Sequence, residues 1–292
     1  MSWICWNAVL AVCLLLSMPA HSADRSIDDG ITAASELIRS QAGEHRLLLL
    51  GEKHGTREIP VLVRTLVSNY ADGAPVVLGL EVPHGEHGAL KSYMDSDGGV
   101  AARSRLQSTS FWSRADDQHD GRRSHDMLDL VEALRMMRRS GHDVAVLPYD
   151  LAPDDARDHH ARDEAMADTL RAAFASMPVG RLIVLTGNVH AMLEKPRDAP
   201  PQMQRPMGSY LRDLDPFSVD IVARQGEFWA CIERCGPVKE SAGAHHSQGD
   251  GSGIWDFRIV LPRFSVARLI GADPAGEVRH DKKRIDRSTP VP

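Results

Sequence analysis

Residues 47–60 read LLLLGEKHGTREIP, a run of leucines followed at once by polar residues. Its four consecutive leucines, Leu47–Leu50, predict a β-strand that is buried on both faces, as the strands of parallel sheets are. A glycine, an acid, a lysine and a histidine follow at once in GEKH, residues 51–54. Because glycine permits a sharp turn and leaves room for a ligand, this strand end indicates a functional site.

Strands and helices alternate from residue 46 to about residue 191. Apolar residues spaced three and four apart between Ile59 and Tyr70 predict a helix, with Thr56 as its N-cap. The other elements expected are strands at 76–81, 143–149 and 182–186, helices at 124–139 and 158–176, and short helices with an ordered loop at 83–124. This alternation predicts an α/β fold, with a mainly parallel sheet and helices on both faces.

The C-terminal third departs from this alternation. Ser218–Ala223 and Phe228–Cys231 flank a short turn at Gln225-Gly226, so we expect an antiparallel hairpin added to the sheet. Trp255–Leu261 predicts one more strand. Two segments of small and polar residues are expected to lack regular structure, a mobile loop at 241–253 and a disordered tail at 272–292.

Composition and charge narrow the class of protein. The 292 residues are 42% hydrophobic and 25% charged, which is typical of a globular protein with a sizeable core. The formal charge of −6 and the lack of a long basic run argue against binding to nucleic acid or to an anionic membrane.

The first residues have the pattern of an export signal. Ala8–Leu16 is apolar but too short to span a bilayer, and small residues follow it as far as Ala23. We therefore expect residues 1–23 to be a signal peptide and residues 24–271 to form the domain. The mature protein would then be periplasmic or secreted, with no stable membrane span. An uncleaved membrane anchor is the alternative, because no Lys or Arg precedes the apolar segment.

Export also bears on the cysteines. Cys5 and Cys13 would leave with the signal peptide, so that Cys231 and Cys235 remain, spaced C-x3-C in CIERCG. In an oxidising compartment such a pair favours a disulfide, and two thiolates alone would underfill the four positions of a zinc site.

Two copies of the pattern G-x-x-H follow predicted strands, and they end in His54 and His190. Glu81 and Asp150 end the two predicted strands between them. The carboxyl ends of parallel strands meet at one edge of the sheet, and open α/β sheets bind their ligands there. We therefore expect these four side chains, together with Glu52, to line one pocket.

Two imidazoles and two carboxylates permit two kinds of chemistry. As metal ligands, His54, Glu52, His190 and Glu81 would suit Zn, Mn, Fe or Co, which could activate a bound water. Without a metal, a histidine held by a carboxylate can itself deprotonate water. Both alternatives make the same four residues the catalytic candidates. Four more charged residues are candidates for binding substrate: Asp120, Arg122, Asp150 and Arg162.

A family resemblance rests on five motifs, which are GEKHGTRE (51–58), GLE (79–81), RDEAMA (162–167), GNVHA (187–191) and MGSYL (207–211). They resemble motifs of the superfamily that joins the ChaN-like haem-uptake lipoproteins, the Tiki and TraB proteins and the erythromycin esterases. The resemblance covers about residues 46–225. It implies an α/β fold with a deep site, in which Glu52, His54, Glu81 and His190 match positions that bind metal or activate water.

Members of this superfamily differ in chemistry. Tiki proteins are described as metal-dependent proteases, the esterases open a lactone, and ChaN binds haem through a tyrosine, for which Tyr93 is the loop candidate here. The first hypothesis is therefore an exported hydrolase acting on an ester or amide of a small molecule or peptide. The alternatives are a haem-binding protein without catalysis and a binding domain without turnover.

Overall fold

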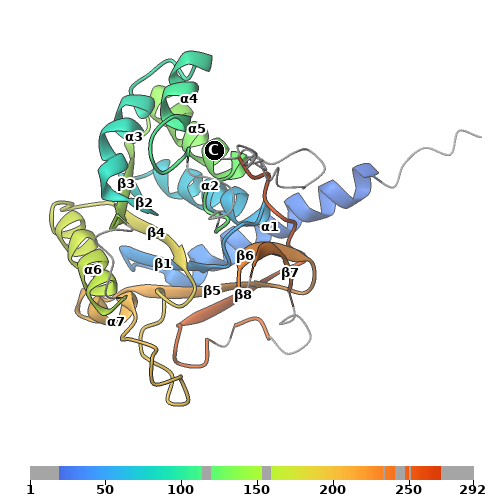
Figure 1. Cartoon of the computed structure of the whole chain (residues 1–292), viewed down its shortest axis with the longest axis vertical. Coiled ribbons are helices and arrows are strands. Elements are labelled where there is room, and N and C mark those ends of the chain that lie inside the picture. Colours follow the sequence, from blue (N-terminus) through green and yellow to red (C-terminus); the bar gives the residue numbers. More distant parts are fainter. Residues whose placement is uncertain are drawn as a thin grey trace, which may run out of the picture.

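A six-stranded sheet, in which every strand pair is parallel, forms the centre of the molecule (Figure 1). The computed structural model describes residues 20–113, 120–152, 159–232, 234–240, 247–249 and 251–270. In the order β3-β2-β4-β1-β5-β8, the strands are Val144–Asp150, Val76–Pro83, Arg181–Gly187, Leu47–Glu52, Phe217–Ala223 and Phe257–Leu261. The predicted α/β class with a mainly parallel sheet is confirmed.

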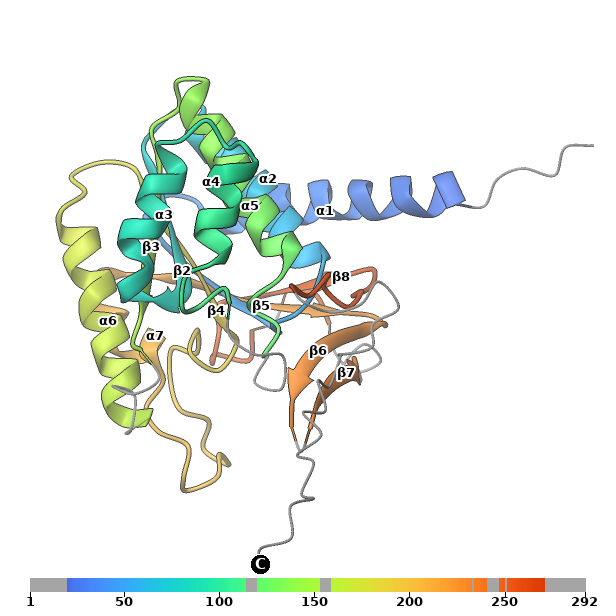
Figure 2. The same ribbon diagram turned by 45° about the horizontal axis from the view of Figure 1, so that its top comes forward.

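Helices cover both faces of this sheet (Figures 1 and 2). One face carries α1 (Ala20–Ala42), α2 (Glu58–Ala71), α3 (His87–Met94), α4 (Val100–Gln107) and α5 (His125–Arg139), and the other carries α6 (His159–Ala175) and α7 (Met207–Tyr210). In β1, Leu48 and Leu50 belong to the first core, Leu47 and Leu49 belong to the second, and all four are fully buried. The run of four leucines is therefore required by burial on both faces.

α2, α5 and α6 lie close to their predicted positions, but α1 and α7 were not expected, and one predicted cap is wrong. The described residues also contain the 3-10 turns η1 (His84–Glu86) and η3 (Arg212–Leu214). Ser124 caps α5, because its hydroxyl accepts a bond from the Met127 amide at 3.1 Å. Thr56 does not cap α2, which begins after Arg57 without a side-chain cap. The backbone of Thr56 instead forms a bridge to Val266, which draws this residue away from the helix end.

The predicted C-terminal hairpin pairs the wrong strands. β5 lies in the main sheet, parallel to β1 and to β8. β6 (Glu227–Cys231) pairs antiparallel with β7 (Cys235–Lys239), in a separate two-stranded sheet. Burial explains the difference, because every residue of β5 is buried whereas β6 buries only Trp229. The predicted disulfide between Cys231 and Cys235 is confirmed and closes the β6–β7 hairpin.

Several expected features fall partly or wholly outside the described residues. Residues 1–19 of the expected signal peptide lie outside them, and α1 begins at Ala20, before the expected cleavage site. Most of the expected loop (241–246 and 250) and the whole expected tail also lie outside. Within the described ranges, none of the helices has both the length and the apolar character that crossing a membrane requires.

Candidate functional site

The two G-x-x-H patterns lie side by side because β1 and β4 are adjacent and parallel, with Glu52 opposite Gly187. A Cβ atom on Gly187 would lie 3.3 Å from Nε2 of His54 and 3.4 Å from Cδ2 of His190. Such contacts are tighter than ordinary van der Waals packing. Glycine at this position therefore lets both imidazoles converge at the carboxyl end of the sheet.

Glu81, at the carboxyl end of β2, is the centre of the cluster. Its Oε2 accepts hydrogen bonds from the Gly187 amide at 2.7 Å and from the Thr186 hydroxyl at 3.0 Å. Its Oε1 accepts from Nη2 of Arg162 at 2.8 Å and lies 3.3 Å from Nη1 of Arg122. The side chain is buried, so these four donors replace water as partners of the carboxylate.

His54 is held by the carboxylate two residues before it. Nδ1 of His54 lies 3.0 Å from Oε1 of Glu52, and Nε2 lies 3.8 Å from Oε1 of Glu81. Burial alone would lower the pKa of His54, but the two carboxylates outweigh burial and raise it above its ordinary value. The Nδ1–H therefore donates to Glu52, which leaves the Nε2 lone pair of the neutral ring facing the cluster.

His190 has a matching carboxylate, Asp163 of α6. Nδ1 of His190 lies 2.7 Å from Oδ1 of Asp163, which also accepts the Met207 amide at 2.7 Å. Nη1 of Arg162 lies 3.1 Å from Nε2 of His190. Because a guanidinium can only donate, Nε2 must be the acceptor and Nδ1 must carry the proton. Thus Nε2 of His190 is already engaged by Arg162.

Contacts of Arg122 and Arg162 bring the four predicted substrate-binding residues together. Arg162 binds Asp150 through Nε and Nη2, each at 2.8 Å. Arg122 binds Asp150 at 3.0 Å and Asp120 at 2.6 Å. Burial opposes the charge on both guanidinium groups, but the surrounding carboxylates raise the pKa of each arginine. These arginines remain cationic at any working pH and fix positive charge beside the two imidazoles.

The same charges determine the state of Glu81. Burial by itself would raise the pKa of Glu81, yet His54, His190, Arg122 and Arg162 together hold it well below its usual range. Glu81 is therefore a carboxylate at neutral pH. It acts as an acceptor and a fixed negative charge rather than as an acid.

The β6–β7 hairpin holds the segment that carries His54. The Trp229 amide donates to the Gly55 carbonyl at 3.1 Å, and Nζ of Lys53 binds both oxygens of Glu240 at 2.8 Å. Gly55 has a φ of +72°, and a Cβ there would lie 2.6 Å from the side chain of Trp229. The hairpin therefore fixes the path of the chain on both sides of His54, and this position requires glycine.

The candidate residues from the sequence lie in one cluster, which consists of Glu52, His54, Glu81, Asp120, Arg122, Asp150, Arg162 and His190. His54 and His190 remain partly open, with 22% and 19% of their side chains exposed. Sequence reasoning missed Asp163 as the partner of His190. Its position beside Arg162 in RDEAMA was the available signal. The pairing of Lys53 with Glu240 had no local signal, because 187 positions separate the two residues.

The donor set does not fit a divalent metal. Both oxygens of Glu81 are occupied by hydrogen-bond donors, and a guanidinium nitrogen lies against Nε2 of His190. A divalent ion bound to these side chains would have to displace the Thr186, Gly187 and Arg162 donors. In the described part of the chain, no group of three or more His, Cys, Asp or Glu side chains is arranged to hold a metal ion.

Tyr93 does not fit a haem ligand, and its expected place in a loop is wrong. It lies in α3, is buried, and donates its hydroxyl to Oε2 of Glu132 at 2.8 Å. The helix forms because Leu90, Tyr93 and Met94 lie on one apolar face that packs into the core.

The fold and the site define an α/β protein with histidine–carboxylate pairs at the carboxyl edge of a parallel sheet. A mutant of the erythromycin esterase EreC, in its open conformation, shares this fold with a TM-score of 0.59 and 10% identity, over 80% of this chain and 94% of that one. A succinoglycan biosynthesis protein has a TM-score of 0.59 and 10% identity, over 85% of this chain and 99% of that one. A Bacillus cereus protein has a TM-score of 0.55 and 10% identity, over 82% and 93%.

No family model matches the chain, and no curated protein matches its sequence. At 10% identity, the solved structures establish a shared fold only. The fold implied by the resemblance to the erythromycin esterases is therefore confirmed.

Proposed function

We propose that this chain is a hydrolase in which His54 removes a proton from a water molecule that attacks the carbonyl carbon of an ester or amide. The pairing of His54 with Glu52 carries this proposal. A carboxylate 3.0 Å from Nδ1 fixes the tautomer and leaves Nε2 as the base. The carboxylate of Glu81, whose Oε1 lies 3.8 Å from the same nitrogen, would stabilise the imidazolium that forms when His54 takes the proton.

The proposed reaction proceeds through an oxyanion. The water oxygen bonds to the carbonyl carbon, its proton passes to Nε2 of His54, and the carbonyl π electrons move to oxygen. When the carbonyl re-forms, the bond to the leaving oxygen or nitrogen breaks, and the His54 imidazolium returns its proton to that atom. The products are a carboxylic acid and an alcohol or amine. The cationic Arg162 is placed to stabilise the oxyanion, as preorganised donors do in acyl transfer.

We assign His190 a positioning role. Its Nε2 accepts from Arg162, and its Nδ1–H donates to Asp163. His190 therefore orients the guanidinium toward the reacting atoms while Asp163 fixes the imidazole. Because hydrogen-bond donors already occupy Glu81 and Nε2 of His190, we propose that this reaction proceeds without a metal.

We also propose that the protein acts after export, in the periplasm or outside the cell, on a small-molecule or peptide substrate. The apolar N-terminal segment and the disulfide between Cys231 and Cys235 support this placement.

A panel of activated esters and amides, beginning with p-nitrophenyl acetate, tests the proposal on protein dialysed against a chelator. We expect hydrolysis above the buffer rate that survives the chelator. Activity that is lost on chelation and restored by Zn would contradict the metal-free reaction. A Soret band on haem titration, with no hydrolysis of any member, would favour the haem-binding alternative.

A further inference from the structure

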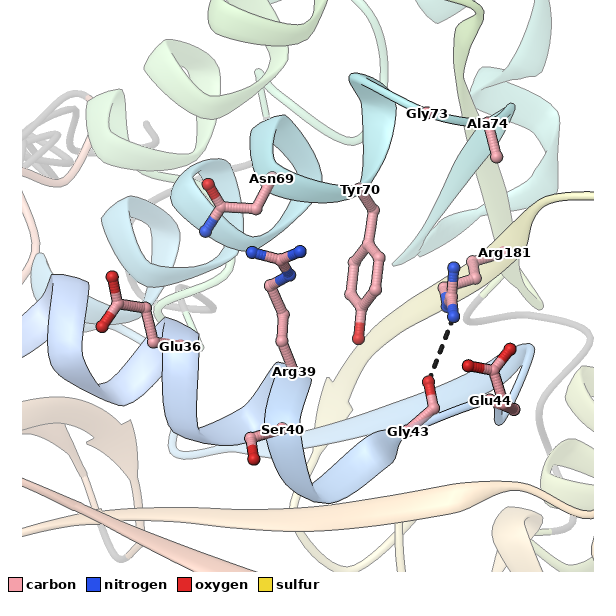
Figure 3. Close-up of a pocket in the computed structure, with 10 residues that line it drawn as sticks. All are labelled: Glu36, Arg39, Ser40, Gly43, Glu44, Asn69, Tyr70, Gly73, Ala74 and Arg181. Atoms are coloured by element: carbon pink, nitrogen blue, oxygen red, sulfur yellow. Dashed lines mark hydrogen bonds between the residues drawn. The ribbon is translucent and has the colours of Figure 1, made fainter.

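A cavity lies at the opposite edge of the sheet, away from His54. Its volume is about 590 Å³, within the range of small-molecule sites. It opens at the amino ends of β1, β2 and β4, where Gly43, Ala74 and Arg181 lie. Its lining includes Glu36, Arg39, Gly43, Glu44, Tyr70 and Arg181 (Figure 3).

Tyr70, in the last turn of α2, lies between two arginines. The Cζ atom of Arg181 is 4.4 Å from the centroid of the tyrosine ring, and that of Arg39 is 5.5 Å from it. Figure 3 shows the ring between these two side chains, with its hydroxyl directed toward the last turn of α1. Two cations that share one aromatic ring repel each other, and an anion bound beside them would offset this repulsion.

The Tyr70 hydroxyl is an unused donor. Tyr70 is only 8% exposed, and its Oη has no hydrogen-bond partner in the described part of the chain. Burial raises the pKa of this phenol, which Arg181 and Arg39 lower only in part, so the hydroxyl keeps its proton. Leaving a buried donor unpaired costs about 1–3 kcal/mol, and an acceptor oxygen would recover this loss.

The arginines are placed to bind that acceptor. Arg181 donates from Nη2 to the Gly43 carbonyl at 3.1 Å and from Nε to the His45 carbonyl at 3.3 Å, so its guanidinium is fixed at the cavity wall. Figure 3 shows the first of these bonds. Arg39 forms no ion pair among the residues that the structure describes, and its side chain is exposed. It is free to close over a bound anion.

The other lining residues restrict the ligand. Glu36 and Glu44 add negative charge, which disfavours a polyanion and favours hydroxyl groups that can donate to carboxylates. A Cβ on Gly43 or Gly73 would meet no atom within 4 Å, so both backbone segments face open space.

We propose that this cavity binds a small hydroxylated molecule with a single anionic group, a carboxylate or phosphoryl group, held by Arg39, Arg181 and Tyr70. The site lies at the amino edge of the sheet and is separate from the hydrolase site. Its ligand therefore need not be a substrate or product of the proposed reaction.

Gluconate and glucose are the probes, because both carry many hydroxyl groups and only gluconate carries a carboxylate. Titrations of ¹⁵N-labelled protein at constant ionic strength would follow the amides of Gly43, Glu44 and Gly73 by NMR. We expect saturable shifts at these amides with gluconate and none with glucose. The affinity for gluconate should fall at least about tenfold in Arg39→Gln, through loss of a charge-assisted bond, and about threefold or more in Tyr70→Phe.

Arg64→Gln is the matched control, because it removes the same charge from an exposed position on α2 away from the cavity and should leave the affinity unchanged. Three results would each overturn the proposal. The first is an absence of saturable shifts up to about 50 mM gluconate, because a dissociation constant above that concentration is too weak for a binding site. The second is equal shifts with glucose, and the third is an unchanged affinity in Arg39→Gln or Tyr70→Phe.

Discussion

Glu52→Gln should lower the pKa of His54, because Glu52 is the carboxylate that directly binds its imidazole. The substitution keeps an acceptor oxygen 3.0 Å from Nδ1, so the tautomer is retained while the charge is lost. A hydrogen bond to a charged group contributes about 1.5–3 kcal/mol. At about 1.4 kcal/mol per pKa unit, the pKa of His54 should fall by roughly one to two units. Glu81, which also raises this pKa, is left in place.

Histidine labelled with ¹³C at Cε1 gives the pKa directly from an NMR titration, with the His54 resonance assigned by its loss in His54→Ala. Since the wild-type pKa lies above 6.5, the base form accumulates only as the pH rises through that higher value. Any ester hydrolysis should show the same acid limb, and in Glu52→Gln the limb should move to lower pH. Glu194→Gln, a change at an exposed carboxylate, should leave the titration unaltered. An unchanged or higher His54 pKa in Glu52→Gln would refute the reasoning.

Three further changes test the charges, the packing and the export of the protein. Glu81→Gln leaves two buried guanidinium groups short of a partner and should lower the free energy of unfolding at pH 7 by about 3–5 kcal/mol. The pKa of Glu81 is depressed in the folded protein, so its carboxylate stabilises the fold above about pH 4.5. This stabilisation is lost as the pH falls through the pKa of Glu81 in the folded protein. Denaturant melts of the wild type and of Glu81→Gln should therefore converge in acid. Thr56→Val removes a buried hydroxyl that has no partner in the described residues, and it should raise the melting temperature in calorimetry, by an amount equivalent to about 1 kcal/mol; a fall would show an unseen partner. Mass spectrometry of the exported protein should find residues 1–23 absent and no free thiol at Cys231 or Cys235. Replacing both cysteines by serine should lower the free energy of unfolding by no more than about 2 kcal/mol, because the disulfide closes a short loop.

The sequence predicts the central strands and the site because both depend on local patterns. Leu47–Leu50 favours a strand with two buried faces, and the G-x-x-H patterns follow adjacent strands of one parallel sheet. Parallel pairing then brings His54 and His190 to the same edge. No long-range information was needed for that inference.

The C-terminal hairpin and the carboxylate partners of His190 and Lys53 could not be predicted in the same way. A turn at Gly226 suggested that β5 and β6 pair, yet this glycine, with a φ of +113°, packs against the backbone of Phe264 and directs the chain out of the main sheet. Whether β5 pairs with β6 or with β1 is decided by burial across the whole sheet. Likewise, the bonds of Asp163 to His190 and of Glu240 to Lys53 depend on the packing of distant segments.

Turnover by His54→Ala tests the central claim most directly. If His54 is the general base, kcat on any ester that the wild type hydrolyses should fall about 10²–10⁴-fold. The melting temperature should change little, because His54 is partly exposed and Glu52 can take a water as its partner. His142→Ala is the matched control, since that imidazole contacts Asp72 on the far side of the molecule, and it should keep full activity. Full activity in His54→Ala, with the fold intact, would contradict the account.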